Sequence, residues 1–143
     1  MRIVLDTNVL IRGHARSQSA ARRLLEFLVT GGHALVLSNA ILAEVTKVLR
    51  YPRFQAVYQF TERELYEYIQ FLQSVSDSVI LDPQYGAPVR DQSDLAILQT
   101  AEQGAADVIC TNDRDFYDQA VIAYCALRGI EVCDELTLLA RLK

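Results

Sequence analysis

The sequence predicts an α/β protein in which a single-domain parallel β-sheet, spanning residues 1–143, is flanked by helices on both faces. Short continuous apolar runs, such as 34–37 and 108–110, are typical of strands buried on both sides. Longer segments with apolar residues at helical spacing alternate with these runs. The length of 143 residues fits one domain with a substantial core, and no internal repeat or linker divides it.

The composition is that of an ordinary globular protein, with 51% hydrophobic and 22% charged residues. No apolar run approaches the length of a membrane span, and Asp6 interrupts the only N-terminal candidate for a signal segment. We therefore expect no membrane association and a cytoplasmic location. Three cysteines without a C-x-x-C pair and two distant histidines argue against a disulfide framework, a zinc site or a Ser-His-Asp triad. We expect the cysteines to be buried thiols.

The net charge of −4 conceals an asymmetry along the chain. Residues 1–63 carry nine Arg and Lys against four Asp and Glu, whereas residues 64–143 carry five against fourteen. A basic half can attract an anionic polymer and an acidic half can hold cations. This favours a phosphate-bearing substrate, although arginines scattered over solvated helix faces would give the same counts.

The first predicted strand, at 2–5, runs directly into Asp6, Thr7 and Asn8. In open α/β sheets, ligands bind beyond the carboxyl ends of parallel strands, which makes Asp6 a candidate ligand or catalytic group. The same residue types are also common caps of a following helix. The first strand alone does not decide between these two roles.

The remaining elements follow from apolar spacing together with turn and capping residues. Two glycines at 31–32 stop the first amphipathic helix, and Ser38 is a natural N-cap for the next one. Thr61 and Glu64 form a capping box, and the aromatic residues around it are expected to pack in the core, with a base-stacking platform as the alternative. We expect helices at 19–29, 39–50, 91–104 and 135–142, and one or two more over 54–60 and 61–75. Further strands are expected at 34–37, 79–81, 108–110 and 129–133, a loop or a frayed helix start at 12–19, and a loop at 82–88.

Glu44 lies at an unusual position on its predicted helix. At about 100° per residue, it falls on the rim of the apolar face and not opposite that face, where a solvated Glu belongs. Glu44 is therefore a candidate site residue, although its side chain can also extend to water.

Asp94 lies on the inward stripe of its own helix, because Leu98, Ala101 and Ala105 follow it at helical spacing. A carboxylate on that stripe needs a partner or a cation. The competing explanation is that the helix dipole favours an acid in the first turn. Because Asp91 or Ser93 can cap the helix, Asp94 remains available for another role.

The segment 107–113 repeats the opening pattern: an apolar strand is followed by Thr111, Asn112 and Asp113. Two parallel strands would therefore end in Asp6 and Asp113, with Asp115 in the next turn. Four carboxylates thus point to one sheet edge, where they would repel one another unless a cation were present. Oxygen ligands without His or Cys favour Mg²⁺ or Mn²⁺, and such ions promote phosphodiester hydrolysis.

We predict Asp6, Glu44, Asp94 and Asp113 as metal ligands and catalytic residues, Asn8, Thr111 and Asp115 as their support, and Arg12, Arg16 and Arg114 as substrate-binding residues.

Four motifs in this order resemble the PIN-domain ribonucleases: I-V-L-D-T-N-V-L at 3–10, L-S-N-A-I-L-A-E-V at 37–45, D-Q-S-D-L-A-I-L at 91–98 and T-N-D-R-D-F at 111–116. The similarity covers nearly the whole chain and is greatest to the toxin components of bacterial toxin–antitoxin modules. It implies a PIN-like, Rossmann-like three-layer sandwich. It also implies an endoribonuclease dependent on Mg²⁺ or Mn²⁺, often a homodimer, sometimes inhibited by a small antitoxin protein.

The acidic positions of that family match Asp6, Glu44, Asp94 and Asp113 of this chain. Relatives often have two adjacent acids where this chain has Ser93 and Asp94, which leaves the number of metal ions open.

Two other functions remain compatible with the sequence. An Asp at a strand end can be a phosphoacceptor, as in receiver domains or aspartyl-phosphate phosphatases, but neither Lys47 nor Lys143 is placed for the lysine those designs use. The other is a catalytically silent PIN-like module that binds RNA or protein, which the presence of all four acids argues against.

Overall fold

In a computed structural model, which describes residues 1–14, 16–84, 86–87 and 91–143, five strands form one parallel sheet. The strands lie in the order β3-β2-β1-β4-β5, and each neighbouring pair is parallel. This confirms the predicted α/β class. The strands are β1 (Arg2–Leu5), β2 (Ala34–Ser38), β3 (Ser76–Val79), β4 (Val108–Cys110) and β5 (Glu131–Cys133).

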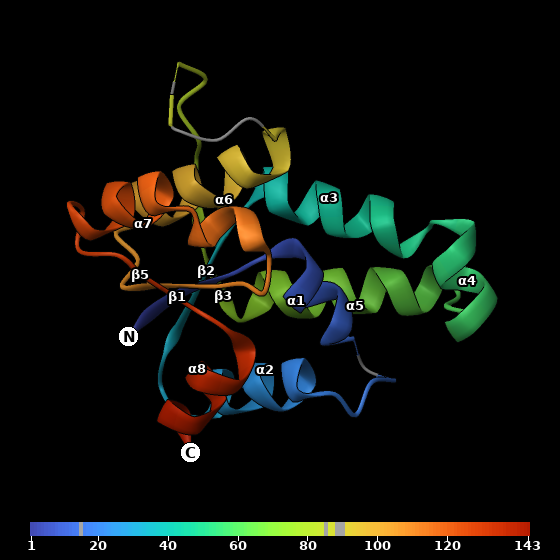
Figure 1. Ribbon diagram of the computed structural model, residues 1–143. Coiled ribbons are helices and arrows are strands. Elements are labelled where there is room, and N and C mark those ends of the chain that lie inside the picture. Colours follow the sequence, from blue (N-terminus) through green and yellow to red (C-terminus); the bar gives the residue numbers. More distant parts are fainter. Residues whose placement is uncertain (15, 85, 88–90) are drawn as a thin grey trace.

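Helices cover both faces of the sheet, as predicted. Figure 1 shows α6 and α7 on one face and α2 and α8 on the other, while α3, α4 and α5 extend beyond the sheet. No helix in the described part of the chain is both long and apolar enough to cross a lipid bilayer. The helices are α1 (Thr7–Arg12), α2 (Ala20–Thr30), α3 (Asn39–Leu49), α4 (Pro52–Tyr58), α5 (Glu62–Ser74), α6 (Gln92–Gln103), α7 (Gln119–Ala126) and α8 (Glu135–Leu142), with a 3₁₀ helix, η1 (Arg114–Tyr117).

The core is built around the three central strands. Ile3 and Val4 of β1, Leu35 of β2 and Ile109 of β4 have no exposed surface. Strands buried on both faces need no polar alternation, which explains why these runs are continuously apolar. The three cysteines are free and buried, as expected.

Local capping signals in the sequence are confirmed. The Ser38 side chain caps α3, and Thr61 and Glu64 form the reciprocal capping box at the start of α5. The Asp91 side chain accepts a hydrogen bond from the backbone N–H of Ser93 at 2.7 Å, so Asp91 is the N-cap of α6. Asp94 is therefore not needed as a cap.

The third strand is displaced from its predicted position. We expect it at 79–81 from apolar content, but β3 spans Ser76–Val79, and the Ile80 side chain beyond it is 94% exposed. β3 is the outer strand of the sheet and pairs only with β2. Its position is therefore set by register with β2, and an edge strand tolerates polar residues that a central strand excludes.

His14, which the sequence leaves without a partner, is buried among aromatic rings. Its ring lies edge-on to those of Phe54, Tyr58 and Phe60, with centroid distances of 5.5, 4.6 and 5.3 Å. Its Nδ1 accepts a hydrogen bond from the backbone N–H of Arg16 at 3.2 Å, and burial lowers the pKa of His14. These three aromatic residues therefore pack around His14, but only Phe60 lies in the core as predicted, since Tyr58 is 39% exposed.

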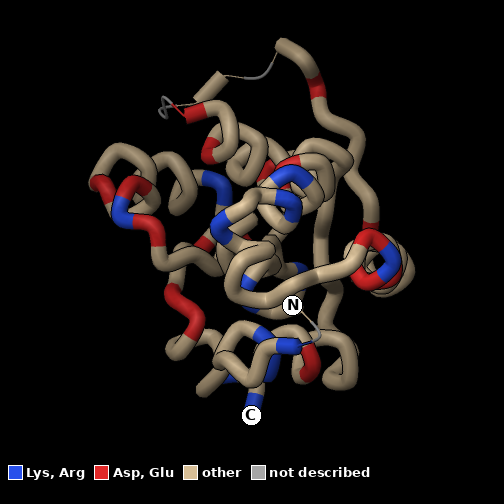
Figure 2. Tube along the Cα trace, turned by 90° about the vertical axis from the view of Figure 1, so that its right-hand side faces the viewer, with Lys and Arg blue, Asp and Glu red and all other residues tan. Residues whose placement is uncertain are grey.

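The charge asymmetry along the sequence does not separate into two faces. Acidic and basic residues interleave around the described chain (Figure 2). Eight arginines make ion pairs, which engages most of the positive charge in local contacts: Arg2, Arg12, Arg16, Arg22, Arg50, Arg63, Arg128 and Arg141.

Gly104 ends α6 at a point where the helix approaches β2 and β3. A Cβ atom there would lie 2.5 Å from a methyl carbon of Val36 and 2.8 Å from the carbonyl oxygen of Thr100. We expect Gly104→Ala to lower the free energy of unfolding by about 1–3 kcal/mol, because the core must shift to admit the methyl group. Urea unfolding measures the change.

Gly86 is the matched control, since nothing lies within 4 Å of a Cβ atom built there. Gly86→Ala should change stability by no more than about 0.5 kcal/mol. Equal effects of the two substitutions would contradict the close approach at Gly104.

Candidate active site

The strand order creates a crevice at the carboxyl ends of β1 and β4. From β1 the chain moves outward to β2 and β3, and it then returns to the other side of β1 to form β4 and β5. The connections on the two sides of β1 therefore leave in opposite directions, which opens a crevice at this switch point. Asp6 follows β1, and the segment from Thr111 to Asp113 follows β4.

Asp6 is held mainly by the segment that follows the neighbouring strand β4. It occupies the N-cap position of α1, but its side chain makes no capping hydrogen bond. Its Oδ2 instead accepts a hydrogen bond from the Thr111 hydroxyl at 2.6 Å. The side chain is only 6% exposed. The Asp6 side chain is thus not a helix cap.

Thr111 connects the two strand ends. Besides donating to Asp6, its hydroxyl oxygen accepts a hydrogen bond from the backbone N–H of Asp113 at 3.0 Å. Its carbonyl oxygen accepts a hydrogen bond from the Tyr117 hydroxyl at 2.7 Å. The residue has no exposed surface. These hydrogen bonds hold Thr111 and the loop after β4 in place.

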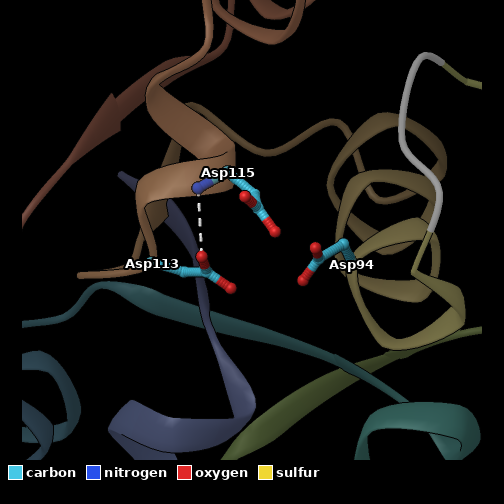
Figure 3. Close-up of side chains that lie close together, drawn as sticks. All are labelled: Asp94, Asp113 and Asp115. Carbon is cyan, nitrogen blue, oxygen red and sulfur yellow. Dashed lines mark hydrogen bonds between the residues drawn. The ribbon is translucent and has the colours of Figure 1, made fainter.

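Three carboxylates converge in the crevice: Asp94, Asp113 and Asp115. One oxygen of each lies within 4.8 Å of the others. Figure 3 shows Asp94 reaching from α6 toward Asp113 and Asp115, which follow β4. The backbone N–H of Asp115 donates to Asp113 Oδ1 at 3.0 Å, and this hydrogen bond caps η1. The short turn thus brings two acids onto one side.

Electrostatic strain accompanies this convergence. The pKa of Asp94 is raised to about 7, first by burial and then by the negative charge of Asp113, with smaller contributions from Asp91, Asp6 and Asp115. Burial also raises the pKa of Asp6, while the hydrogen bond from Thr111 lowers it. Perturbed carboxylates in a crevice are typical of functional sites.

The three converging carboxylates fit a hard divalent cation. Two oxygens bound to one Mg²⁺ at about 2.1 Å lie at most about 4.2 Å apart, so small side-chain rotations would bring these oxygens to ligand distances. Mn²⁺ favours the same oxygen donors. A cation there would also neutralise the repulsion that raises the pKa of Asp94.

Glu44 stands apart from this group. It lies on α3, is half-buried, and lines a cleft together with Thr7 and Ser93. It is not among the three acids whose oxygens converge. Asp115, expected only as support, is one of those three. A metal-ligand role for Glu44 therefore remains a prediction. Glu44 and Ser93 line the same cleft.

The predicted supporting and substrate-binding residues differ in their surroundings. Asn8 is exposed, and its side chain makes no hydrogen bond within the described chain. Arg12 forms an ion pair with Glu135, and Arg16 donates through Nε and Nη2 to Glu64. Arg114 is exposed beside the acids and makes no ion pair with any described residue, which leaves its guanidinium available to substrate.

The cleft beside the acids includes residues that the sequence reasoning did not single out. Gln92, Leu95, Ala96 and Gln99 line it from α6. They are spaced at i, i+3, i+4 and i+7, which places them on one helix face. This spacing could have identified the four residues as one helix face. The same helix also carries an apolar stripe, and that stripe dominates its sequence pattern.

Comparisons with known proteins give one family and a shared fold. The family model described as PIN domain matches residues 2–115. No curated protein matches the chain. Crystal structures with the same fold include VapBC2 from Rickettsia felis bound to a DNA fragment from their promoter, at 14% identity and a TM-score of 0.62, and FitAcB from Neisseria gonorrhoeae, at 18% identity and a TM-score of 0.55. Each comparison covers 94% of this chain and 98% of the other chain.

The raised pKa of Asp94 predicts an unusual pH dependence of stability without divalent ions. The folded protein retains the Asp94 proton up to about pH 7, whereas the unfolded chain releases it near 3.8. This group's contribution to stability is therefore present below about pH 4 and is lost as pH rises through about 7. We expect Asp94→Asn to gain stability relative to the parent protein between these limits.

Urea unfolding at about pH 5 and about pH 8 in EDTA tests this difference. Asp118→Asn, an exposed acid, is the matched control. An Asp94→Asn variant whose pH dependence equals that of the parent would show that the Asp94 carboxyl titrates normally.

Proposed function

The chain belongs to the PIN domain family, and we propose that it is a nuclease that hydrolyses phosphodiester bonds of RNA with a divalent metal ion, Mg²⁺ or Mn²⁺. The convergence of Asp94, Asp113 and Asp115 at the sheet's switch point is the observation that carries this proposal. Carboxylates placed this close repel one another when ionised, which favours binding of a cation, and phosphodiester hydrolysis is chemistry that such a cation supports.

Each acid has a distinct part in holding the site together. Asp94, Asp113 and Asp115 would hold the ion, while Asp6, which is not one of these three, has one oxygen bonded to Thr111. When bound, the ion would supply activation of water and stabilisation of the leaving oxygen. Glu44, in the cleft wall, would orient water or hold a second ion. The number of ions stays open.

The RNA substrate rests on two supports. The four motifs resemble those of PIN-domain ribonucleases, and the exposed Arg114 guanidinium beside the acids is free to pair with a phosphate. Arg12 and Arg16 would first have to leave Glu135 and Glu64. We therefore assign initial phosphate contact to Arg114.

We also propose that the nuclease is a toxin paired with a small antitoxin protein. The motif resemblance to toxin components supports this, as does the fold shared over nearly the whole chain with proteins from the VapBC2 and FitAcB structures. A homodimer is part of the same proposal and has no support beyond the resemblance.

The alternative functions have less support. A receiver-like phosphoacceptor would need a lysine at a neighbouring strand end, but Lys47 lies near the end of α3 and Lys143 follows α8. A catalytically silent binding module would not need Asp94, Asp113 and Asp115 to converge at a cost in repulsion.

Cleavage of mixed-sequence single-stranded RNA tests the proposed activity. We expect cleavage with Mn²⁺ and none with EDTA, because the acids alone cannot neutralise the developing charge. Asp6→Asn and Asp113→Asn should each reduce the rate by about 100-fold or more. Gel analysis of end-labelled RNA measures the rates.

Glu67→Gln is the control, since Glu67 is exposed on α5 and pairs only with Arg63. It should cleave at the parental rate. If the parent protein and Asp6→Asn show the same residual activity, the centre is wrongly assigned.

The bridging hydroxyl of Thr111 gives a second test. Thr111→Val keeps the shape of the side chain but removes the hydrogen bonds to Asp6 and Asp113. We expect the Mn²⁺ concentration for half-maximal activity to rise about 10–100-fold, because loss of a residue that orients ligands typically weakens metal binding by that factor.

Thr111→Ser retains the hydroxyl and should remain within a few-fold of the parent. Isothermal titration with Mn²⁺ measures the same change without turnover. Equal metal affinity in the valine and serine variants would rule out a positioning role for the hydroxyl.

A further inference from the structure

A cleft of about 530 Å³ lies between α3 and α6, next to the acidic group. Ser93 is one of its lining residues and immediately precedes Asp94, so the cleft opens beside the proposed reaction centre. Its volume is within the range of small-molecule sites. We call it the α3–α6 cleft.

The described lining of the α3–α6 cleft disfavours a phosphate group. Among the described residues that line it, the charged ones are Glu44 and Asp82, and none is Arg, Lys or His. Two carboxylates would repel a phosphate at this short range. If an RNA strand passes the acidic centre, the part that enters this cleft is therefore uncharged.

The walls of the cleft suit a nucleobase. Leu95 and Ala96 of α6, both half-buried, present apolar surface to the face of a planar ring, and Gln92, Ser93 and Gln99 supply polar groups for its edges. Single-stranded RNA is read in this way, by packing against base faces and by hydrogen bonds to base edges.

The outer wall of the cleft is tied in place from α6. The Gln99 Nε2 donates to the carbonyl oxygen of Asp82, and the backbone N–H of Asp82 donates to Gln103 Oε1 at 3.1 Å. Gln99 is only 6% exposed. Its amide orientation follows from that contact, because a carbonyl oxygen accepts only from the NH₂ end. The Gln99 Oε1 is then left as an acceptor.

The fixed polar groups of the cleft are mainly acceptors. Asp82 is a carboxylate and Gln99 offers its Oε1, while the Glu44 carboxylate is assigned to the metal centre. One oxygen of Asp82 already accepts from the backbone N–H of Gln84 at 2.9 Å, and the other is available. Such a set selects a base whose edge donates hydrogen bonds. Guanine offers adjacent N1–H and N2–H₂ donors that match a carboxylate in pairs, cytosine one amino group, and uracil a single N–H.

We propose that the α3–α6 cleft binds the nucleobase adjacent to the scissile phosphate and selects guanine. The assignment of this base to the cleaved RNA rests on the proposed nuclease function. Recognition of the base itself does not, because the cleft is formed by residues other than Asp94, Asp113 and Asp115.

Nucleoside binding tests the cleft without catalysis. In EDTA, ¹⁵N-labelled protein is titrated with guanosine, cytidine and uridine at equal concentrations, and amide chemical shifts are followed. We expect guanosine to bind about fivefold or more tightly than uridine, with the largest shifts in α3 and α6. Gln99→Leu and Asp82→Asn should each remove this preference. Gln73→Leu, an exposed position on α5, is the matched control and should retain it.

Mapping of cleavage positions in a random-sequence RNA with Mn²⁺ then links the cleft to the reaction. Cleavage next to guanine should exceed cleavage next to uracil about fivefold or more in the parent and the Gln73→Leu control, and this excess should disappear in Gln99→Leu. Guanosine binding without any RNA cleavage would refute the nuclease function but leave the guanine site standing. RNA cleavage with equal binding of guanosine and uridine, or with preference unchanged in Gln99→Leu, would overturn the guanine site alone.

Discussion

The pairing of β1 with β4 is the constraint on which the site depends. Their register sets Leu5 beside Cys110, so Asp6 and Thr111 leave the sheet together. The Thr111 hydroxyl then joins the two ends, although 105 residues separate it from Asp6 in the sequence. Because the same hydroxyl accepts the backbone N–H of Asp113, one buried threonine positions acids from both strands. The position of Asp6 and Asp113 at one sheet edge is thus a direct consequence of sheet topology.

The same geometry opposes folding, since it gathers negative charge around the buried Asp94 carboxyl. Burial and neighbouring acids raise the pKa of Asp94. The fully buried strands behind the site supply the compensating stability. A cation that binds only the folded state would add stability through the same acids, which couples metal binding to folding. Local instability at the crevice is therefore a reason to expect a ligand there.

The sequence predicted those parts of the fold that local interactions determine. Continuous apolar runs identified the central strands, and side chains such as Ser38 and Asp91 marked helix starts because a cap acts within three residues. The outer strand β3 was predicted, but three residues too late along the chain, since its residues are mostly polar and pairing with β2, not composition, places it. His14 escaped for a related reason: the aromatic rings that enclose it come from residues about 40 positions away.

The sequence predicts an acidic site at this edge of the sheet, but it does not determine which acids converge there. Parallel strand ends share one edge, which is enough to bring Asp6 and Asp113 to the same crevice. Which further acids meet depends on the tight turn η1, which turns Asp115 inward, and on the docking of α6, which presents Asp94. The helix wheel placed Glu44 correctly at the rim of α3, but a wheel cannot say what faces that rim. Glu44 lines the α3–α6 cleft, which Gln92 and Gln99 of α6 also line. One face of α6 thus contributes to the acidic centre and another lines the cleft, so this helix would join chemistry to recognition.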